Sequence, residues 1–419
     1  MLSSLRGTYD ILPEDIKYWH FVEKKAHILF NNANYSEVRT PLIENKELFN
    51  RGVGDETDIV NKEMYCFQDQ GKRDIVLRPE GTAGIARSFI QNKLYNLRPV
   101  NKIWYLGPMF RYERPQNGRQ RQFHQLGIEC LGLANPQTDA EVIAIAYNLL
   151  LELNIGDFRL ELNNIGSSAA RGEYSKQLTQ YLGQYKDQLD KDSRQRLVNN
   201  PFRILDSKSI ETQKILNSAP NLFDFVDSNS KKHFEALCCY LNALGIPYII
   251  NHRLVRGLDY YSDTAFEFKT NLLGGQDTIC GGGRYDNLIS HLGGPPTPAI
   301  GWAIGMERLL ILIKKNYSLH NNKLDFYILS DNTIRCKIEA LVLFSRLINV
   351  HNAKVEIDET ESTVRKKIKR AYKSGAMYCL IIGEKEILNI SITIKNLTNN
   401  EEKSINFKQF LDNPTIHLF

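Results

Sequence analysis

Arginines gather around a predicted hairpin tip in the first third of the chain. Arg111 ends one strand-like run, and Arg114, Arg119 and Arg121 follow in the polar loop before the next run, with Glu113 among them. Convergent guanidiniums suit phosphate oxygens, because the planar fork donates paired hydrogen bonds and stays charged. Taken alone, the cluster is equally typical of a solvated hairpin tip.

A second segment, Thr297 to Ile313, is predicted to be a strand of small residues that runs into a helix. Gly301 and Gly305 remove side chains where a planar ligand could approach the backbone, and Arg308, next to Glu307, could cover that ligand's face. Glycines at a buried strand-to-helix turn are more often explained by packing alone.

The stretch Arg78 to Thr82, RPEGT, puts a carboxylate beside a proline and a glycine just before a predicted helix. Thr82 is a plausible N-cap, which is the simpler interpretation of the stretch. Glu80 is harder to dismiss, because a carboxylate at a rigid turn can receive a substrate ammonium.

The run Leu254 to Tyr261, LVRGLDYY, brings Arg256, Tyr260 and Tyr261 together between two predicted strands. The arginine beside a glycine indicates a loop. Tyrosine hydroxyls can hydrogen-bond an imidazole nitrogen, although packing in the core is the more common role of a tyrosine.

Several familiar motifs are absent from the sequence. It has no GxxxxGK[ST] loop, no GxGxxG at a strand-to-helix junction and no nucleophile motif, which disfavours nucleotide binding of the βαβ kinds. The seven cysteines are unclustered and the nine histidines lack HExxH spacing, so we expect reduced thiols and no zinc site.

Composition indicates an ordinary soluble protein of two or three domains, with 419 residues, 42% hydrophobic and 24% charged. The net charge of +5 permits a polyanionic partner without requiring one. The start, MLSSLRGTYD, has no apolar core of signal-peptide length, and no window approaches about 18 apolar residues. We therefore expect a cytoplasmic protein with no membrane association.

Secondary-structure signals place the candidate residues on an antiparallel framework. Lys102 to Glu113 and Gln122 to Leu133 are strand-like and flank the arginine-rich loop, which predicts a hairpin. Helical spacing predicts helices over Trp19 to Asn32 and over Pro136 to about Asn154. Glu37 to Glu44, with a proline inside, is predicted to be an extended segment near an edge.

The chain then changes character. Roughly Glu173 to Gly245 is polar, with helical periodicity and few strand signals, so we expect a helical insertion. Strand signals return at Pro247 to Ile250 and Phe266 to Lys269, and the polar stretch Ile313 to Lys323 suits a linker. We therefore expect a first domain over residues 1–320, interrupted at about 173–245, and a second over 324–419.

The region after Leu324 alternates strands and helices, which predicts a small α/β domain. The expected strands are 326–329, 354–357 and 378–382, and the expected helices are about 334–348 and 363–375. One face of the second helix crowds basic residues, and the other is apolar. A solvated face and an RNA contact explain this equally well. The basic residues are Arg365, Lys366, Lys367, Lys369, Arg370 and Lys373, and the apolar ones Val364, Ile368 and Tyr372.

With these segments in order, the chain resembles the histidyl-tRNA synthetases across essentially its whole length. Phe110 to Gly127 is similar to class II motif 2, Gly301 to Leu309 to motif 3, and the stretch around Pro41 to motif 1. LVRGLDYY together with CGGGRYD, at Cys280 to Asp286, resembles the two signatures that select histidine. The family often has alanine where Gly281 stands.

The resemblance implies an α+β fold: a class II catalytic domain with an antiparallel sheet and helices, a helical insertion, and a C-terminal α/β anticodon-binding domain. It also implies ATP-dependent activation of L-histidine to histidyl-adenylate, followed by transfer to the 3′ end of tRNA(His). The substrate carboxylate is the nucleophile, so catalysis reduces to positioning and charge neutralisation.

Residue roles are carried over position by position. Arg256 and Arg111 would be catalytic, holding the α-phosphate. ATP would be bound by Arg111, Glu113, Arg119, Phe123 and Arg308, with Phe123 and Arg308 sandwiching adenine and Arg121 as the less well matched alternative to Arg119. Histidine would be bound by Glu80, Thr82, Gln125, Glu129, Tyr260 and Tyr261.

Partners and cofactors follow from the same resemblance. Arg114 and Gln116 would contact the tRNA acceptor end. Mg²⁺ would bridge the ATP phosphates near Glu113, without a dedicated metal site in the protein. Motif 1 implies a homodimer.

Two rival functions share much of this pattern. The regulatory subunit of ATP phosphoribosyltransferase has the same fold and binds histidine. It lacks the anticodon-binding domain, however, and tends to lose the ATP-binding arginines, all of which are present in this sequence. A class II synthetase for another amino acid is the second rival, and the two histidine signatures count against it.

Overall fold

The computed structural model describes the chain except for residues 1, 55–56, 117, 275–276, 320–323 and 415–419. The chain divides into two compact units, Met1–Ser318 and Leu319–Phe419. Among the described helices, none is long and apolar enough to cross a membrane.

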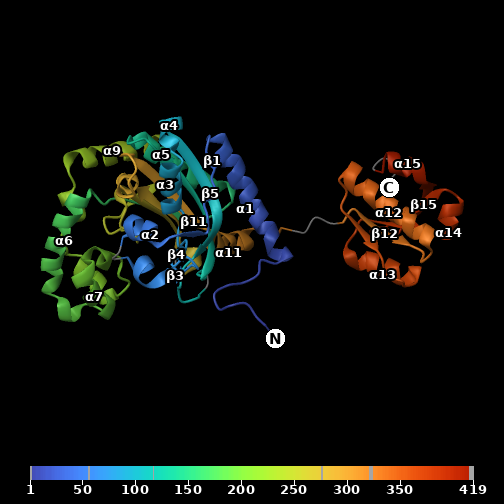
Figure 1. Cartoon of the computed structure of the whole chain (residues 1–419), viewed down its shortest axis with the longest axis horizontal. Coiled ribbons are helices and arrows are strands. Elements are labelled where there is room, and N and C mark those ends of the chain that lie inside the picture. The colour runs from blue at the N-terminus through green and yellow to red at the C-terminus, as the bar shows by residue number, and fades with distance from the viewer. Residues whose placement is uncertain (1, 55–56, 117, 275–276, 320–323, 415–419) are drawn as a thin grey trace. The chain divides into compact units, whose positions relative to one another are not determined.

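The first unit is organised around an eight-stranded sheet in which most neighbours are antiparallel (Figure 1). Among the described strands of this sheet, β1 with β5 and β7 with β8 are the parallel pairs. In spatial order the strands are β1 (Ser36–Glu37), β5 (Asn101–Phe110), β6 (Gln122–Leu131), β11 (Ala299–Gly305), β10 (Thr278–Arg284), β9 (Ser262–Thr270), β7 (Phe158–Asn164) and β8 (Tyr248–Ile250). A three-stranded sheet contains β2 (Ile43–Asn45), β4 (Asp74–Leu77) and β3 (Tyr65–Gln68).

Helices accompany these sheets. The longer ones are α1 (Pro13–Asn32), α5 (Pro136–Glu152) and α11 (Met306–Asn316), and the shorter ones α2 (Lys46–Val53), α3 (Thr82–Gln91), α4 (Leu94–Leu97) and α10 (Leu288–His291). Helix α5 begins where predicted, because Pro136 presets the first turn and the Asn135 side chain accepts a hydrogen bond from the Thr138 N–H at 2.9 Å. Helix α1 begins earlier than predicted, at Pro13.

The two faces of the large sheet differ in chemistry. On β6, Leu126, Ile128 and Cys130 pack in the core that α1, α5 and α11 cover. Because successive side chains on a strand point to opposite faces, Gln125 and Glu129 lie on the other face. The candidate site lies on that polar face.

The predicted hairpin of β5 and β6 is confirmed, with Phe110 paired to Gln122. Strand β5 ends earlier than predicted, at Phe110 rather than Glu113. The Arg111 N–H still donates across the hairpin to the Arg121 carbonyl at 2.9 Å, and the backbone then turns away, since the Tyr112 N–H donates to the carbonyl of Glu63 at 2.6 Å. The candidate arginine Arg111 therefore stands at the first position after the strand.

Helices fill the stretch between β7 and β8, and no strand lies within its fully traced backbone, residues 165–247. They are α6 (Ser168–Gly183), α7 (Lys191–Asn199), α8 (Ile210–Leu216) and α9 (Ser228–Ala243), with short 3-10 turns between them. The last helix, α9, buries Phe234, Leu237 and Leu241 in the main core beside α5. The side chain of Asn164, at the end of β7, donates to the carbonyl of Ser230, at the start of α9, at 2.9 Å.

The expected linker at Ile313 to Lys323 is partly wrong. Helix α11 continues to Asn316, because Ile313 is buried and Lys315 donates to the Leu272 carbonyl at 3.1 Å. Residues 320–323 of the predicted linker lie outside the described residues.

The second unit is a five-stranded sheet with helices, and its strand order is β13-β12-β14-β15-β16. The alternation predicted up to residue 382 is confirmed by β12 (Phe326–Ser330), α12 (Ile334–His351), β13 (Val355–Asp358), α13 (Val364–Ser374) and β14 (Tyr378–Ile382). The antiparallel pair of strands that follows was not predicted from the sequence. The remaining elements are α14 (Glu384–Leu388), β15 (Ser391–Asn396), β16 (Glu402–Asn406) and α15 (Phe407–Asp412).

The basic face predicted for α13 needs correction at two positions. Lys367 is only 1% exposed and donates to the Ser330 carbonyl at 2.8 Å, so it is part of the core. Arg370 pairs with Asp358 at 2.8 Å. The basic residues of α13 that remain exposed are Arg365, Lys366, Lys369 and Lys373.

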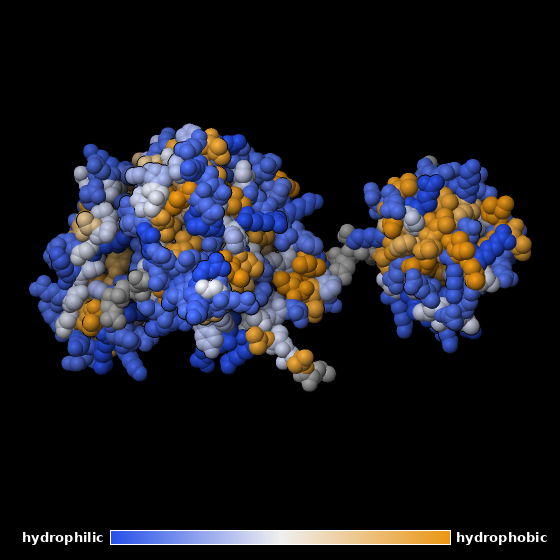
Figure 2. Space-filling model, viewed as in Figure 1, coloured by the Kyte–Doolittle hydropathy of each residue, from blue (hydrophilic) through white to orange (hydrophobic). Residues whose placement is uncertain are grey.

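Apolar side chains also reach the surface of the second unit. On the viewed face they gather around α12 (Figure 2). Five of its large apolar residues are exposed: Ile334, Ile338, Leu341, Val342 and Val350.

Candidate active site

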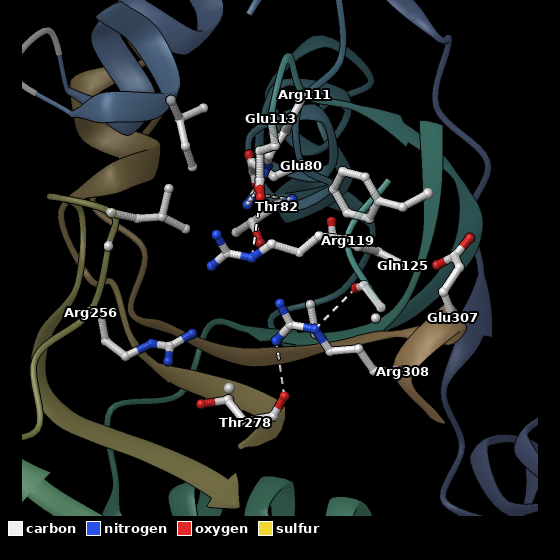
Figure 3. A pocket seen from close by; sticks show the side chains of 18 of the residues that line it. Glu80, Thr82, Arg111, Glu113, Arg119, Gln125, Arg256, Thr278, Glu307 and Arg308 are labelled. Atoms are coloured by element: carbon white, nitrogen blue, oxygen red, sulfur yellow. Dashed lines mark hydrogen bonds and ion pairs between the residues drawn. The ribbon is translucent and has the colours of Figure 1, made fainter. Parts of the chain in front are cut away.

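One cavity of about 270 Å³ opens on the polar face of the large sheet. Most of the residues predicted from sequence line it, although they come from segments far apart in the chain (Figure 3). The predicted residues in its lining are Glu80, Thr82, Arg111, Glu113, Arg119, Phe123, Gln125, Arg256, Tyr260, Tyr261 and Arg308.

Glu80 sits in the turn between β4 and α3, and its carboxylate caps that helix. Its two oxygens accept hydrogen bonds from the backbone N–H groups of Thr82 and Ala83, both at 2.7 Å. Burial raises the pKa of the Glu80 carboxyl. Nearby, the side-chain oxygen of Gln125 is buried without a protein partner. A buried polar atom without a partner is costly, so this oxygen suits a ligand that donates a hydrogen bond.

Glu129 lies beneath the cavity rather than in its lining. The Thr82 hydroxyl donates to one of its oxygens at 2.7 Å, and the Tyr285 hydroxyl donates to the other. Burial raises the pKa of Glu129 to about 8. Gly301, its ladder partner on β11, leaves room for this carboxylate, because a Cβ there would overlap it.

Tyr260 and Tyr261 line this end of the cavity, and Tyr285, outside the lining, packs against Tyr260. The rings of Tyr260 and Tyr261 lie 4.7 Å apart, and those of Tyr260 and Tyr285 lie 5.5 Å apart. Burial raises the pKa of all three, so each keeps its proton and can donate a hydrogen bond. No role was predicted for Tyr285 from the sequence, although this tyrosine stands inside the CGGGRYD signature, which could have indicated a place in the site.

Guanidiniums occupy the other end. Arg111 donates to the Pro79 carbonyl at 2.8 Å, and its guanidinium lies over the Phe123 ring at 5.2 Å. Arg119 pairs with Glu113 at 3.2 Å. Four arginines, Arg256 and Arg308 included, therefore line the cavity, against three carboxylates, those of Glu80, Glu113 and Glu307. Such a surplus of positive charge suits a polyanionic ligand.

Arg308 is placed by two carbonyl groups. Its side chain donates to Gly118 at 3.2 Å and to Thr278 at 3.1 Å. Burial, and then the positive charge of Arg119, lower the pKa of Arg308. Phe123 and Arg308 both line the cavity, and the Phe123 ring lies 5.2 Å from the Arg111 guanidinium.

Arg256 comes from the loop before β9, and its guanidinium pairs with Glu267. Burial lowers the pKa of Arg256, but the Glu267 carboxylate together with Tyr261 and Tyr260 outweighs it, and the net direction is upward. Gly281 on β10 makes the space for this guanidinium, because a Cβ there would overlap it. Figure 3 shows Arg256 entering the cavity opposite Arg111 and Arg119.

Three arginine-loop residues stand apart from the cavity. Arg114 and Gln116 are exposed. Arg121 lies over the Tyr112 ring at 3.9 Å, and it does not line the cavity, whereas Arg119 does. Of the two arginines considered for the nucleotide, the geometry thus favours Arg119.

Arg284, inside the second histidine signature, serves the fold rather than the cavity. It is 2% exposed and binds Asp139 of α5 through contacts of 2.5 Å and 3.0 Å. Asp139 also accepts hydrogen bonds from Thr264 at 2.7 Å and contacts His233 at 2.8 Å. This buried cluster joins β9, β10, α5 and α9.

The described residues contain no group of three or more His, Cys, Asp or Glu side chains arranged to hold a metal ion. Mg²⁺ is usually held by one or two carboxylates together with substrate phosphates, so such a group is not needed for it. Glu113 is the carboxylate that faces the arginines of the cavity.

This fold is that of the class II aminoacyl-tRNA synthetases, in which a largely antiparallel sheet carries the nucleotide site. Within the class, the model described as histidyl-tRNA synthetase matches residues 7–309, and that of the anticodon-binding domain matches residues 328–413. The chain belongs to the histidyl-tRNA synthetase family, whose members are aminoacyl-tRNA ligases.

Relatives match over nearly the whole chain. The chloroplastic histidine–tRNA ligase of Gracilaria tenuistipitata var. liui is 51% identical over 411 residues, which cover 98% of this chain and 97% of that protein. The histidine–tRNA ligase of Acaryochloris marina is 51% identical over 400 residues, covering 96% and 93%. The crystal structure of apo S. aureus histidyl-tRNA synthetase superimposes with a TM-score of 0.81 at 35% identity, covering 98% and 99%.

Proposed function

We propose that this protein activates L-histidine with ATP, releasing pyrophosphate, and transfers the histidyl group to the 3′ end of tRNA(His). One observation carries the proposal: a single cavity has guanidiniums at one end and buried carboxyl, amide and phenol groups at the other. The first end suits a triphosphate, and the second suits a small zwitterion with a polar ring.

The histidine is held at the second end. Glu80 and Gln125 accept hydrogen bonds from its ammonium, and Thr82 lies beside its carboxylate. Glu129, Tyr260 and Tyr261 surround the imidazole, with Tyr261 and Glu129 bonding its two nitrogens. A pocket built on such pairs rejects analogues that lack the partner atoms by about 10⁴ to 10⁵, so editing is not required.

The ATP lies across the arginines. Arg111 and Arg256 hold the α-phosphate from two sides, while Arg119 and Arg308 meet the outer phosphates and the adenine, together with Phe123. The histidine carboxylate attacks the α-phosphorus, so no protein base is needed, and the arginines neutralise the charge that develops. When Mg²⁺ is bound with ATP, Glu113 would be the protein carboxylate that holds it, and the ion would neutralise part of the phosphate charge.

The tRNA is bound by both units. Exposed Arg114 and Gln116 are close in sequence to the cavity residues, which suits contact with the acceptor end. Residues 324–419 act as the anticodon-binding domain, and residues 1–320 as the catalytic domain with its helical insertion at about 173–245. The exposed lysines of α13 are candidates for phosphate contacts.

We propose a homodimer that works in the cytoplasm. Leu42 and Ile43, next to Pro41 in the segment similar to motif 1, are 41% and 52% exposed, which suits an apolar surface covered by a second copy. Sedimentation analysis would test the dimer. Cell fractionation would test the compartment, with a chloroplast as the alternative that the algal relatives' names suggest.

The experiment that tests the function is histidine-dependent ATP–pyrophosphate exchange, run with wild type and Arg256→Ala over a panel of amino acids. We expect exchange with histidine alone, reduced about 10²- to 10³-fold in the variant. If the protein catalysed exchange with another amino acid instead, it would be the synthetase for that amino acid. Folded protein that binds histidine without exchange would instead support the regulatory-subunit alternative.

A further inference from the structure

The guanidinium of Arg256 is fixed by residues that the proposed reaction does not itself use. Its Nη1 pairs with Oε1 of Glu267 on β9, and Glu267 is the ladder partner of Gly281 on β10. Because Gly281 has no side chain, the guanidinium can lie over that position and against the Glu267 carboxylate.

Glu267 is held in turn from its other side. Its Oε2 accepts a hydrogen bond from the Thr278 hydroxyl at 3.1 Å and lies 3.3 Å from the Lys269 ammonium. The side chain of Glu267 is 12% exposed, so water screens these charges only partly. Both oxygens of the carboxylate are therefore engaged in fixed directions.

Lys269 connects this carboxylate to a second one. Glu161 on β7 is the direct ladder partner of Glu267, a like-charge pair that would repel. Lys269 lies 3.0 Å from Glu161 and so bridges the two. Arg159 pairs with Glu161 at 2.9 Å. Arg159 also lies 3.6 Å from Asp277, so three cations, counting Arg256, and three carboxylates form one charged network around Glu267.

Thr278 joins this arrangement to a second arginine. Its hydroxyl holds Glu267, and therefore Arg256, while its backbone carbonyl accepts from Arg308 at 3.1 Å. Figure 3 shows Thr278 near both guanidiniums, with the bond to Arg308 drawn. The start of β10 thus places two arginines of the cavity relative to each other.

We infer that Glu267 is a positioning residue for histidine activation, which acts by holding Arg256 in the orientation that meets the α-phosphate. The inference rests on the proposed function, which assigns that phosphate contact to Arg256. An arginine without a partner samples many rotamers, and ordering it costs free energy at the moment of reaction. Glu267, supported by Thr278 and Lys269, orders Arg256 before ATP binds.

A double-mutant cycle tests the inference. ATP–pyrophosphate exchange is measured for wild type, Glu267→Gln, Arg256→Ala and the double variant. We expect Glu267→Gln to lower kcat about 10- to 100-fold, because a misplacement of about 1 Å costs up to 10²-fold. The KM for histidine stays within about twofold, because Glu267 does not touch the histidine end. The double variant is no slower than Arg256→Ala, because Glu267 acts through Arg256.

Glu161→Gln is the matched control, since it disturbs the same set of charges on β7 without contacting Arg256. Its kcat should stay within about threefold of wild type, a change too small to indicate a lost transition-state contact. If Glu267→Gln fails to fold, Thr278→Val provides a milder test, because it removes one bond to Glu267 and leaves both charges in place. Thr278→Val should lower kcat when Arg256 is present, but it should cause no further fall in kcat when combined with Arg256→Ala.

The outcomes separate the two proposals. If Arg256→Ala exchanges as fast as wild type, the role proposed for Arg256 is wrong. If Arg256→Ala is slow while Glu267→Gln is unchanged, or if the two losses multiply in the double variant, Arg256 keeps its role and the inference about Glu267 is overturned.

Discussion

Gly301 and Glu129 are direct ladder partners between β11 and β6, and a side chain on Gly301 would overlap the Glu129 carboxylate. The glycine of motif 3 therefore has a role distinct from the approach of a planar ligand. It leaves space for the carboxyl group proposed to bind the imidazole.

Gly301→Ala should consequently impair histidine use more than ATP use. The added methyl would overlap both the Glu129 carboxylate and the backbone carbonyl of Ile128, so β6 must shift locally and Glu129 moves away from Thr82 and Tyr285. We therefore expect kcat/KM for histidine to fall about 100-fold, as for other small misplacements of a binding group. Exchange kinetics with each substrate varied in turn would measure this. Gly172→Ala on α6 is the control, because a Cβ there meets nothing within 4 Å. An equal rise of both KM values would contradict the prediction.

The pKa of Glu129, about 8, predicts a pH dependence of stability. Between the ordinary value near 4.5 and about 8, the unfolded carboxyl releases its proton while the folded one retains it. The folded state then binds more protons, so this group's contribution to stability falls as the pH rises through that window. Urea unfolding from pH 5 to 8 should show Glu129→Gln gaining stability relative to wild type. A difference that is constant with pH would rule this out.

Arg119 and Arg121 should differ although they are neighbours. Arg119→Ala removes a guanidinium from the cavity, and a lost hydrogen bond to a charged group costs about 1.5 to 3 kcal/mol. We expect the KM for ATP to rise by roughly that energy, about 10- to 100-fold. Arg121→Ala removes the contact with Tyr112 and a hydrogen bond to the Glu113 carbonyl, and because Arg121 does not line the cavity, this KM should stay within about threefold. If Arg121→Ala raised the KM for ATP more than Arg119→Ala, the nucleotide contact would belong to Arg121.

Asp139→Asn should destabilise the first unit without altering the cavity. Asp139 is fully buried and pairs with Arg284, and breaking such a pair costs about 3 to 5 kcal/mol. Thermal and urea unfolding would measure the loss. At a temperature where the variant is folded, its KM for histidine should match wild type, and a large rise would place Arg284 in the binding machinery.

On α13, Lys366 and Lys369 are exposed, whereas Lys367 is buried. If the helix contacts RNA, replacing both exposed lysines by alanine should weaken tRNA binding and reduce the salt-dependence slope by roughly one per lost phosphate contact. Lys367→Met should lower stability instead and leave the tRNA affinity unchanged. Filter binding at several salt concentrations would distinguish these results.

Sequence reasoning predicted the hairpin, helix α5, the early α/β alternation of the second unit and most of the cavity residues. It could do so because these features depend on local spacing and on motifs. It missed Tyr285 and Glu267, whose roles depend on which residues face each other across strands, and strand register is not visible in one sequence. It also placed Lys367 on the surface, because a basic residue at helical spacing gives no sign of the buried carbonyl that it meets.

The contact between Asn164 and Ser230 brings together the two points where the chain leaves β7 and enters α9. Because β7 and β8 are parallel, they need a crossover, and α9 alone supplies it. Residues 165–227 therefore form an insertion between β7 and α9. A short turn could replace this insertion without changing the strand order of the sheet. The length and shape of this insertion can therefore change without altering the strand order of the large sheet.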